Sequence, residues 1–204
     1  MDTAARHGWV VGATGPKVPA RLVAVDETSR LALAAGQGDR AALASFVQRT
    51  QGEVWRLCAA LSDRTSADDL TQETYVRVLG ALPSFRGDSS ARTWLLAIAR
   101  RTCADDVRRR SRSRRLVRRV RAETRTPVTP DPAGRVELDA LVAELDEGRR
   151  EAFVLTQVLG LDYAEAAEVC GCPIGTIRSR VARARADLAG ALEPLDEAEG
   201  GSGW

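Results

Sequence analysis

The sequence predicts an all-α protein with two helical domains, a flexible linker between them and a helix-turn-helix in the second domain. Apolar residues recur at spacings of three and four along most of the chain, which is the period of a helix with one buried face. No stretch shows the strict alternation of a half-buried strand. Prolines 127, 130 and 132 interrupt the helical pattern, so the 204 residues divide into two units.

The first domain is expected to span residues 27–115. It follows a segment, residues 1–26, that mixes glycine, proline, alanine and valine without a period and is interpreted as a flexible extension. Two helices open the domain, because leucine, valine and aromatic residues keep three-four spacing on both sides of a break near residues 36–39.

A third helix is expected after Ser66, because Asp68 and Asp69 suit the positive end of a helix, with Asp68 the stronger candidate for the cap. Pro83 ends this helix. A fourth helix starts at about Ser90 and continues into an arginine-rich segment.

The linker is expected over residues 116–135, the second domain over residues 136–192, and a disordered tail, acidic and glycine-rich, over residues 193–204. The second domain closes with the predicted helix-turn-helix.

That motif starts with a short helix over residues 163–170, whose apolar side is Ala166, Ala167 and Val169. Gly171 stands where the chain must turn sharply, a place that suits a residue free to adopt positive φ. Pro173 lies close to the start of the second helix, where its missing N–H costs nothing. The predicted buried stripe of this second helix is Ile174, Ile177 and Val181.

The other faces of the second helix are rich in arginine. Such a helix behind a tight turn is typical of proteins that read the major groove, because arginine can donate two hydrogen bonds to a guanine edge. The competing interpretation is an ordinary helical hairpin with a solvated charged face.

Charge is strongly segregated along the chain, although the net charge is only +2. Residues 100–125 hold twelve arginines and three acids, whereas residues 136–170 hold nine acids and two arginines. The basic block indicates an anionic partner such as nucleic acid or the acidic lining of another protein. A further hypothesis is internal: the basic block docks on the acid-rich segment of the free protein and hides both DNA-binding surfaces.

Several function classes are disfavoured. The cysteines Cys58, Cys103, Cys170 and Cys172 form no CxxC pair, and the only histidine is His7, so neither a zinc site nor a cofactor is expected. The cysteines fit small, at least partly buried thiols in a reducing cytoplasm. No apolar run reaches 18 residues, so stable membrane insertion is not expected.

A metal-dependent nuclease is the enzymatic alternative. Its metal ligands would be carboxylates that stand at helix starts or beside arginines, without a histidine or lysine nearby, so a protein without catalytic activity is favoured. The carboxylates concerned are Asp68, Asp69, Glu73, Asp105 and Asp106.

Three stretches in the right order carry a resemblance to a known family. DDLTQETY (residues 68–75) with LPSFR (82–86) is similar to region 2.2 of the extracytoplasmic-function (ECF) group of sigma-70 RNA polymerase sigma factors. ARTWLLAIAR (91–100) is similar to region 2.3 running into region 2.4, and residues 163–188 resemble region 4.2. The segments SSARTWLLAIAR and CGCPIGTIRSRVARAR most resemble the actinobacterial sigma C subgroup.

The resemblance implies a subunit that binds core RNA polymerase, through the clamp helices and flap of its large subunits, and directs initiation at promoter DNA. The first domain would dock on polymerase and open the −10 element, and the second would read the −35 element. The implied polymerase-binding residues are Asp68, Asp69, Gln72, Glu73 and Arg77. The implied −10 residues are Arg100, Arg101, Arg108, Arg109 and Arg110. The implied −35 residues are Thr176, Arg178, Ser179 and Arg183. An anti-sigma factor is a further partner that the family commonly has.

Some assignments stay open at this point. Trp94 either packs in the core or stacks on an unpaired base. The family often has asparagine where this chain has Arg101 and an aromatic residue where it has Asp106, which leaves the −10 preference open; Asp106 either faces inward or pairs with Arg109 or Arg110. Arg185 either contacts phosphate or is solvated. A helix-turn-helix regulator that is not a polymerase subunit is the alternative function.

Overall fold

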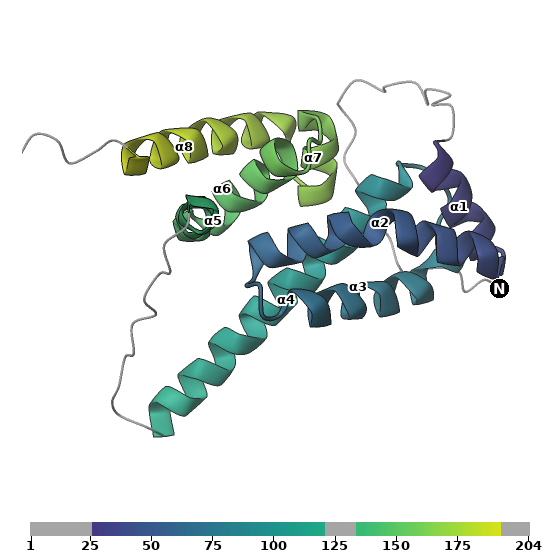
Figure 1. Ribbon diagram of the computed structural model, residues 1–204, viewed down its shortest axis with the longest axis horizontal. Coiled ribbons are helices and arrows are strands. Elements are labelled where there is room, and N and C mark those ends of the chain that lie inside the picture. The colour runs from purple at the N-terminus through teal and green to yellow at the C-terminus, as the bar shows by residue number, and fades with distance from the viewer. Residues whose placement is uncertain (1–25, 121–133, 193–204) are drawn as a thin grey trace, which may run out of the picture.

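The computed structural model describes residues 26–120 and 134–192, and over these ranges helices joined by turns and short loops are its only regular secondary structure (Figure 1). The predicted N-terminal extension except Asp26, most of the predicted linker and the predicted tail lie outside the described residues. The predicted all-α fold is confirmed.

The first domain contains α1 (Glu27–Gly36), α2 (Arg40–Leu61), α3 (Ala67–Ala81), a 3₁₀ turn η1 (Leu82–Ser84) and α4 (Ala91–Val120). Aspartates cap the first two helices: Asp26 accepts from the backbone N–H of Ser29, and Asp39 accepts from Ala41 and Ala42. α4 continues five residues into the segment that was predicted as linker.

The core of this domain lies where α2, α3 and α4 meet. Its largest side chains are almost fully buried, as expected for helices with an apolar stripe. These are Phe46, Val54, Leu57, Val78, Leu95 and Leu96. Trp94 is half-buried and packs on Phe85, with ring centroids 4.9 Å apart, so the core interpretation of this tryptophan is favoured.

The second domain contains α5 (Gly134–Glu144), α6 (Glu147–Phe153), a π-helical turn η2 (Val154–Val158), α7 (Tyr163–Cys170) and α8 (Ile174–Leu192). α7 starts with a capping box, in which Asp162 accepts from the backbone of Glu165 and the Glu165 side chain accepts from the backbone of Asp162. These caps fix where the helix-turn-helix begins.

The predicted helix-turn-helix is present. Its first helix has the predicted bounds, and Gly171 has φ of 64°, the left-handed conformation that glycine adopts without strain. Ile177 and Val181 are buried as predicted, but Ile174 is wrong as a buried residue, because 40% of it is exposed. It is the first residue of α8, and the buried residues of this helix begin at Ile177.

The two domains are in direct contact in the structure. α4 of the first domain packs against α7 of the second, and α2 packs against α5 and α6. Figure 1 shows the C-terminal part of α4 extending beyond the body of its domain.

Candidate functional site

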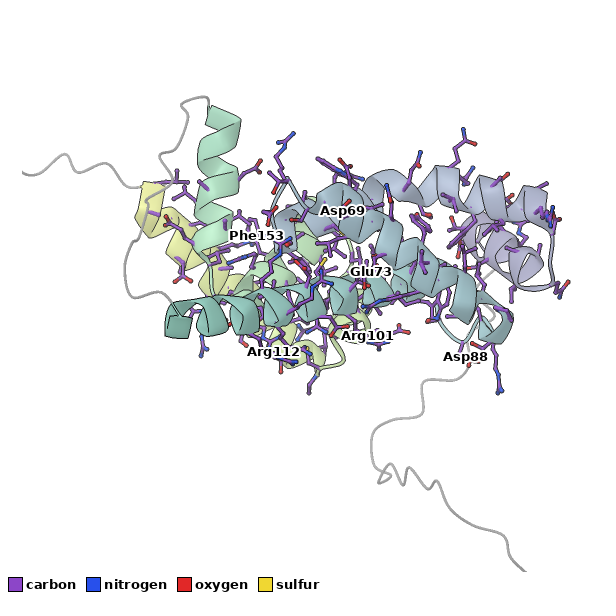
Figure 2. All side chains as sticks on the ribbon, turned by 90° about the horizontal axis from the view of Figure 1, so that it is seen from below. Asp69, Glu73, Asp88, Arg101, Arg112 and Phe153 are labelled. Carbon is purple, nitrogen blue, oxygen red and sulfur yellow. The ribbon has the colours of Figure 1, made fainter. Side chains whose placement is uncertain are left out.

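The outward side of α3 combines acidic and apolar residues. Asp69 and Gln72 are exposed and Glu73 is partly exposed, so the predicted polymerase-binding residues do lie together on one helix (Figure 2). Val76 and Leu79 continue this side, with 69% and 49% of each residue exposed. Sequence analysis did not single out either residue as exposed. This side of α3 therefore offers both apolar and charged groups to another molecule.

Asp68 is not the cap of α3. Ser66 occupies the N-cap position, without a capping hydrogen bond from its side chain, and Asp68 lies in the first turn. Its carboxylate accepts from Nε1 of Trp55 on α2, at 2.8 Å. The expected cap was wrong because a contact with a neighbouring helix takes the side chain, and such a contact cannot be read from local sequence.

Arg77 of α3 makes two ion pairs, one of which connects α3 to α4. Its guanidinium donates to Glu73 at 2.6 Å and to Asp105 of α4 at 2.8 Å. The hydrogen bond with Asp105 raises the pKa of Arg77 in spite of partial burial, and the same bond lowers the pKa of Asp105. Arg77 therefore links the acidic side of α3 to the arginine-rich side of α4.

The predicted −10 arginines separate into three environments along α4. Arg101, Arg108 and Arg109 are exposed, and Arg112 continues their side of the helix (Figure 2). Arg108 has only a long ion pair of 3.5 Å with Asp105. This exposed row is a positively charged surface that a phosphate backbone can approach.

Arg100 has a different position, at the contact between the domains. Its Nε lies 2.8 Å from Oε1 of Glu151 on α6, as an ion pair without the alignment of a hydrogen bond. The side chain of Glu151 is 5% exposed and that of Arg100 is 24% exposed. Burial raises the pKa of Glu151, and the charge of Arg100 opposes this rise without cancelling it. The Nε of Arg100 is therefore engaged by the second domain while the domains are packed together.

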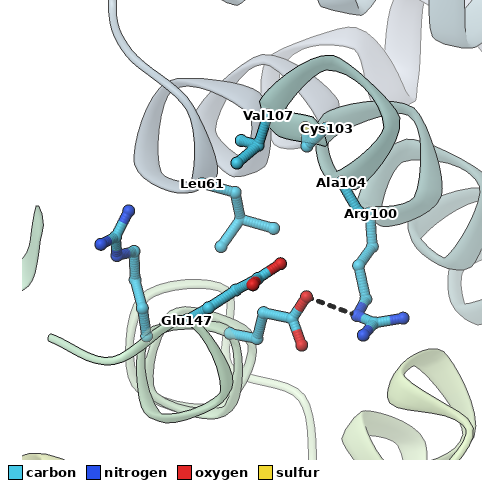
Figure 3. Close-up of a pocket in the computed structure, with 8 residues that line it drawn as sticks. Leu61, Arg100, Cys103, Ala104, Val107 and Glu147 are labelled. Carbon is cyan, nitrogen blue, oxygen red and sulfur yellow. Dashed lines mark ion pairs between the residues drawn. The ribbon is translucent and has the colours of Figure 1, made fainter. Parts of the chain in front are cut away.

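A cavity of about 120 Å³ lies beside this ion pair (Figure 3). Its walls come from α2 and α4 on one side and from α6 on the other, so it belongs to the interface between the domains. The lining residues are Leu61, Arg100, Cys103, Ala104, Val107, Glu147, Arg150 and Glu151. A second interdomain contact lies at the start of α4, where Arg92 donates to the carbonyl oxygen of Leu159 and also binds Glu53.

Arg110 is held by the first domain itself. It binds Asp63 and the hydroxyl of Ser66 in the turn between α2 and α3, and its Nε lies 2.7 Å from Asp106. Asp106 is 3% exposed, so the interpretation that it faces inward is confirmed, and it pairs with both Arg109 and Arg110. The inward carboxylate is thus neutralised by two guanidinium groups.

The arginines of α8, the second helix of the helix-turn-helix, also differ in their environments. Arg178, Ser179 and Arg183 are exposed on one side, and Thr176 is half-buried at the start of the helix. The hydroxyl of Ser179 donates to the carbonyl oxygen of Thr176, at 3.0 Å. Among the described residues, Arg178 and Arg183 have no ion pair, so their guanidinium groups remain available to a base edge.

Other arginines of the second domain serve its packing. Arg180 lies so close to Gly148 of α6 that a Cβ there would come within 3.0 Å of the guanidinium carbon. Arg185 donates to the side-chain oxygen of Gln157, at 2.6 Å, which favours a structural over a phosphate-binding assignment. Arginine content alone could not separate these roles, because α6 and the π-helical turn decide which side of α8 is covered.

All four cysteines are free thiols in the structure. Cys58 and Cys103 are buried, as predicted, with their thiols facing each other in the core of the first domain. Burial raises the pKa of Cys170 to about 12, so this thiol is protonated at neutral pH. Within residues 26–120 and 134–192, no group of histidine, cysteine or carboxylate side chains is arranged to hold a metal ion.

Comparison with known families matches both halves of the chain. Residues 46–113 match the family described as Sigma-70 region 2, and residues 135–188 match the family described as Sigma-70, region 4. Each match lies in one of the two helical domains.

Comparison with curated proteins gives relatives of nearly the same length. The probable RNA polymerase sigma-C factor of Mycobacterium bovis is 51% identical over 174 residues, which cover 84% of this chain and 94% of the relative. The ECF RNA polymerase sigma factor EcfG of Rhodopseudomonas palustris is 39% identical over 136 residues, which cover 65% of this chain and 74% of the relative. The predicted resemblance to sigma C is confirmed.

Two solved structures have a similar fold. CnrH in complex with the cytosolic domain of CnrY has a TM-score of 0.65 and 29% sequence identity, covering 82% of this chain and 97% of that one. The sigma factor RpoE from Bartonella quintana, in complex with the anti-sigma factor NepR, has a TM-score of 0.64 and 29% identity, covering 76% of this chain and 98% of that one. None of the helices in the described part of this chain has the length and hydropathy needed to cross a membrane.

Proposed function

The chain belongs to the ECF group of the sigma-70 family of RNA polymerase sigma factors, and from this membership we propose how its two domains divide the work of promoter-directed initiation. α3 docks on the clamp helices of core polymerase, the exposed row of α4 binds the −10 element, and α8 reads the −35 element while the second domain contacts the flap. The separation of acidic and apolar residues on α3 from exposed arginines on α4 and α8 carries this proposal.

The protein contributes specificity and no catalysis of its own, and it acts in the cytoplasm, where polymerase and promoter DNA are found. An anti-sigma factor is a further partner, because two similar structures are complexes, one of them with a named anti-sigma factor. Run-off transcription with core polymerase and a set of candidate promoters tests the proposal. Failure to start RNA on any template would refute it. Sequence-specific DNA binding by a chain that does not bind core polymerase would favour a separate helix-turn-helix regulator.

Replacing Glu73 by lysine is expected to weaken the binding of core polymerase by at least about tenfold, which corresponds to ~1.4 kcal/mol. The substitution reverses the charge of a partly exposed carboxylate on the acidic side of α3 and removes its ion pair with Arg77. Affinity for core polymerase is measured by fluorescence anisotropy of the labelled full chain.

Glu27→Lys is the matched control, because it makes the same charge change at an exposed carboxylate on α1. Binding of −35 duplex DNA by the Glu73→Lys chain should stay as in the parent. Equal assembly of both variants with core polymerase would contradict the assignment of α3.

Replacing Arg178 by alanine is expected to lower affinity for particular −35 base pairs by roughly 1–3 kcal/mol. The guanidinium is exposed on α8 and has no ion pair among the described residues, so it is available for a base edge. Competition between promoters with single −35 substitutions measures the loss position by position.

Arg185→Ala is the control for charge, since Arg185 is already engaged by Gln157. It should weaken binding slightly and equally on all sequences. If Arg178→Ala also lost affinity equally on every sequence, base reading by Arg178 would be excluded.

We further propose that the packed arrangement belongs to the free chain and that polymerase separates the domains. The −10 and −35 elements are about 25 base pairs apart, or roughly 85 Å along the duplex at 3.4 Å per pair. Two domains in direct contact cannot place α4 and α8 on both elements. Support also comes from the Arg100–Glu151 ion pair, which occupies one of the −10 arginines.

The packing of the two domains restricts promoter binding mainly because it keeps α4 and α8 too close together, and less because it covers the DNA-binding surfaces. Arg101, Arg109, Arg178 and Arg183 are exposed in the packed chain, so domain packing does not hide both DNA-binding surfaces as expected. Of the predicted −10 arginines, the interface engages Arg100. Each domain could therefore meet DNA separately, but a promoter that needs both elements would be read only after opening.

A further inference from the structure

Asp106 is the most deeply buried carboxylate on the arginine-rich part of α4. Its side chain is 2% exposed, whereas residues 107–109 and 111–112, which follow it on the helix, are exposed. Oδ1 accepts from Nη2 of Arg109 at 2.7 Å, Oδ2 lies 2.7 Å from Nε of Arg110, and Ser62 donates to Oδ2 at 3.4 Å. A buried carboxylate is costly unless it is paired in this way, so the two arginines are its compensation.

The pairing extends to the turn before α3. Arg110 also binds Asp63 and the hydroxyl of Ser66, and Ser66 in turn donates to Asp63 from both its backbone and its side chain. Partial burial raises the pKa of Asp63, but the hydrogen bonds from Thr65, Ser66 and Arg110 outweigh it and hold the pKa well below its usual range. The network thus joins α4 to the start of the polymerase-docking helix.

Arg109 occupies the opposite side of the same carboxylate. Its side chain is 71% exposed, so the guanidinium is held at one edge by Asp106 while the rest of it faces solvent beside Arg108. A free arginine side chain loses rotamer freedom when it binds a phosphate. One that is already fixed by a buried partner loses less, which strengthens binding at a defined position.

We propose that Asp106 is a positioning residue for promoter DNA. It fixes Arg109 and Arg110, so that this turn of α4 meets the −10 strand as an ordered surface and not as mobile charges. The inference rests on the proposed function of α4 as the −10-binding helix.

A rival account treats Asp106 only as a negative charge close to DNA. Removing it would then raise affinity for every DNA, because the net positive charge of the surface increases. If Asp106 positions the arginines, its removal should lower affinity for a promoter. The freed arginines would then bind phosphates at many positions along the DNA instead of one defined position. The two accounts differ in the sign of the change in promoter affinity.

The test compares Asp106→Asn with the parent chain, each assembled with core polymerase. Affinity is measured for a promoter, for the same promoter with a scrambled −10 element and for a random duplex of equal length, over a series of salt concentrations. The ratio of promoter to random affinity is expected to fall about tenfold, with core assembly unchanged. An unchanged or increased ratio would overturn the proposal.

Two further variants keep the test decisive if Asp106→Asn unfolds. Asp88→Asn removes the same charge from an exposed carboxylate just before α4 that has no ion pair among the described residues, and it should leave the ratio at the parent value. Arg109→Lys keeps the charge and leaves Arg110 on Asp106, but loses the planar donor fork. It should lower the ratio without lowering the melting temperature, and full retention of the ratio would refute the positioning role.

Failure of the underlying function gives a different pattern. If the parent holoenzyme does not distinguish the promoter from its scrambled −10 version, α4 is not a −10 reader in this chain. If the parent does distinguish them and Asp106→Asn and Arg109→Lys behave as the parent does, only the role of Asp106 is wrong.

Discussion

Replacing Arg100 by methionine is expected to separate the two domains of the free chain. The substitution keeps most of the apolar stem of the side chain but leaves Glu151 buried and charged without its partner. Orphaning one member of a buried ion pair costs about 3–5 kcal/mol. Opening relieves this cost, because Glu151 then reaches water. Small-angle scattering of the free chain, or energy transfer between dyes on α2 and α8, measures the separation.

Glu151→Gln is the informative counterpart, and its effect is expected to be much smaller. Arg100 is 24% exposed and has a long side chain that can turn toward solvent, whereas Glu151 is 5% exposed and cannot. A double substitution, Arg100→Met with Glu151→Leu, should close the domains again, because no buried charge remains. A closed Arg100→Met chain at neutral pH would show that the ion pair does not control the interface.

The same pair gives the separation a pH dependence with a definite sign. Burial raises the pKa of Glu151 above its usual 4.5, so the packed state binds a proton more tightly than the open state. The contribution of Glu151 to packing is therefore complete below its ordinary pKa and is lost as pH rises through the raised value. Arg100→Met removes the cation that opposes the rise, so acidification should bring this variant back to the packed state.

The pKa values of Arg100 and Glu151 are both raised, but the two shifts have different causes. The charge of Glu151 raises the pKa of Arg100 against the effect of burial, which indicates a favourable pair. The raised pKa of Glu151 indicates that its own burial costs more than Arg100 returns. The near-complete burial of Glu151 agrees with a burial cost larger than the gain from Arg100. The intact pair therefore adds little net stability to the interface, but it makes the packing of the two domains depend on pH.

The parts of the fold that sequence predicted are those with local causes. The helix-turn-helix depends on a glycine in the left-handed conformation, a capping box and a period of three and four, all within a few residues. Ile174 failed because its burial depends on how the first turn of α8 meets other helices. The cap of α3 failed for the same reason, since Trp55, thirteen residues away, binds Asp68.

The candidate site was predicted as a set of residues but not as an arrangement. Composition identified the arginine block and the family resemblance assigned its role, but neither could show that Arg100 reaches the second domain or that Arg110 is bound by Asp63, 47 residues earlier. Such pairings depend on the packing of distant helices. Exposed Val76 and Leu79 were also missed, because their apolar character at helical spacing predicts a core.

Replacing Ile177 by alanine is expected to destabilise the second domain by about 2–5 kcal/mol. The side chain is fully buried on α8, so its removal costs transfer free energy and leaves a cavity beneath the recognition helix. Arg178 and Ser179 follow it directly, so loss of α8 from its neighbours should also remove −35 binding. The midpoint of urea unfolding, followed by a probe in the second domain, measures the change, with an unchanged slope confirming that stability alone has shifted.

Ile174→Ala is the matched control, because it makes the same substitution three residues earlier at a position that is 40% exposed. It should cost well under half as much, since little apolar surface returns to water and no closed cavity forms. The first domain is expected to keep its affinity for core polymerase in both variants, because its core does not include Ile177. Equal destabilisation by the two substitutions would mean that the first turn of α8 is packed in solution, and the buried stripe of the recognition helix would then have to include Ile174.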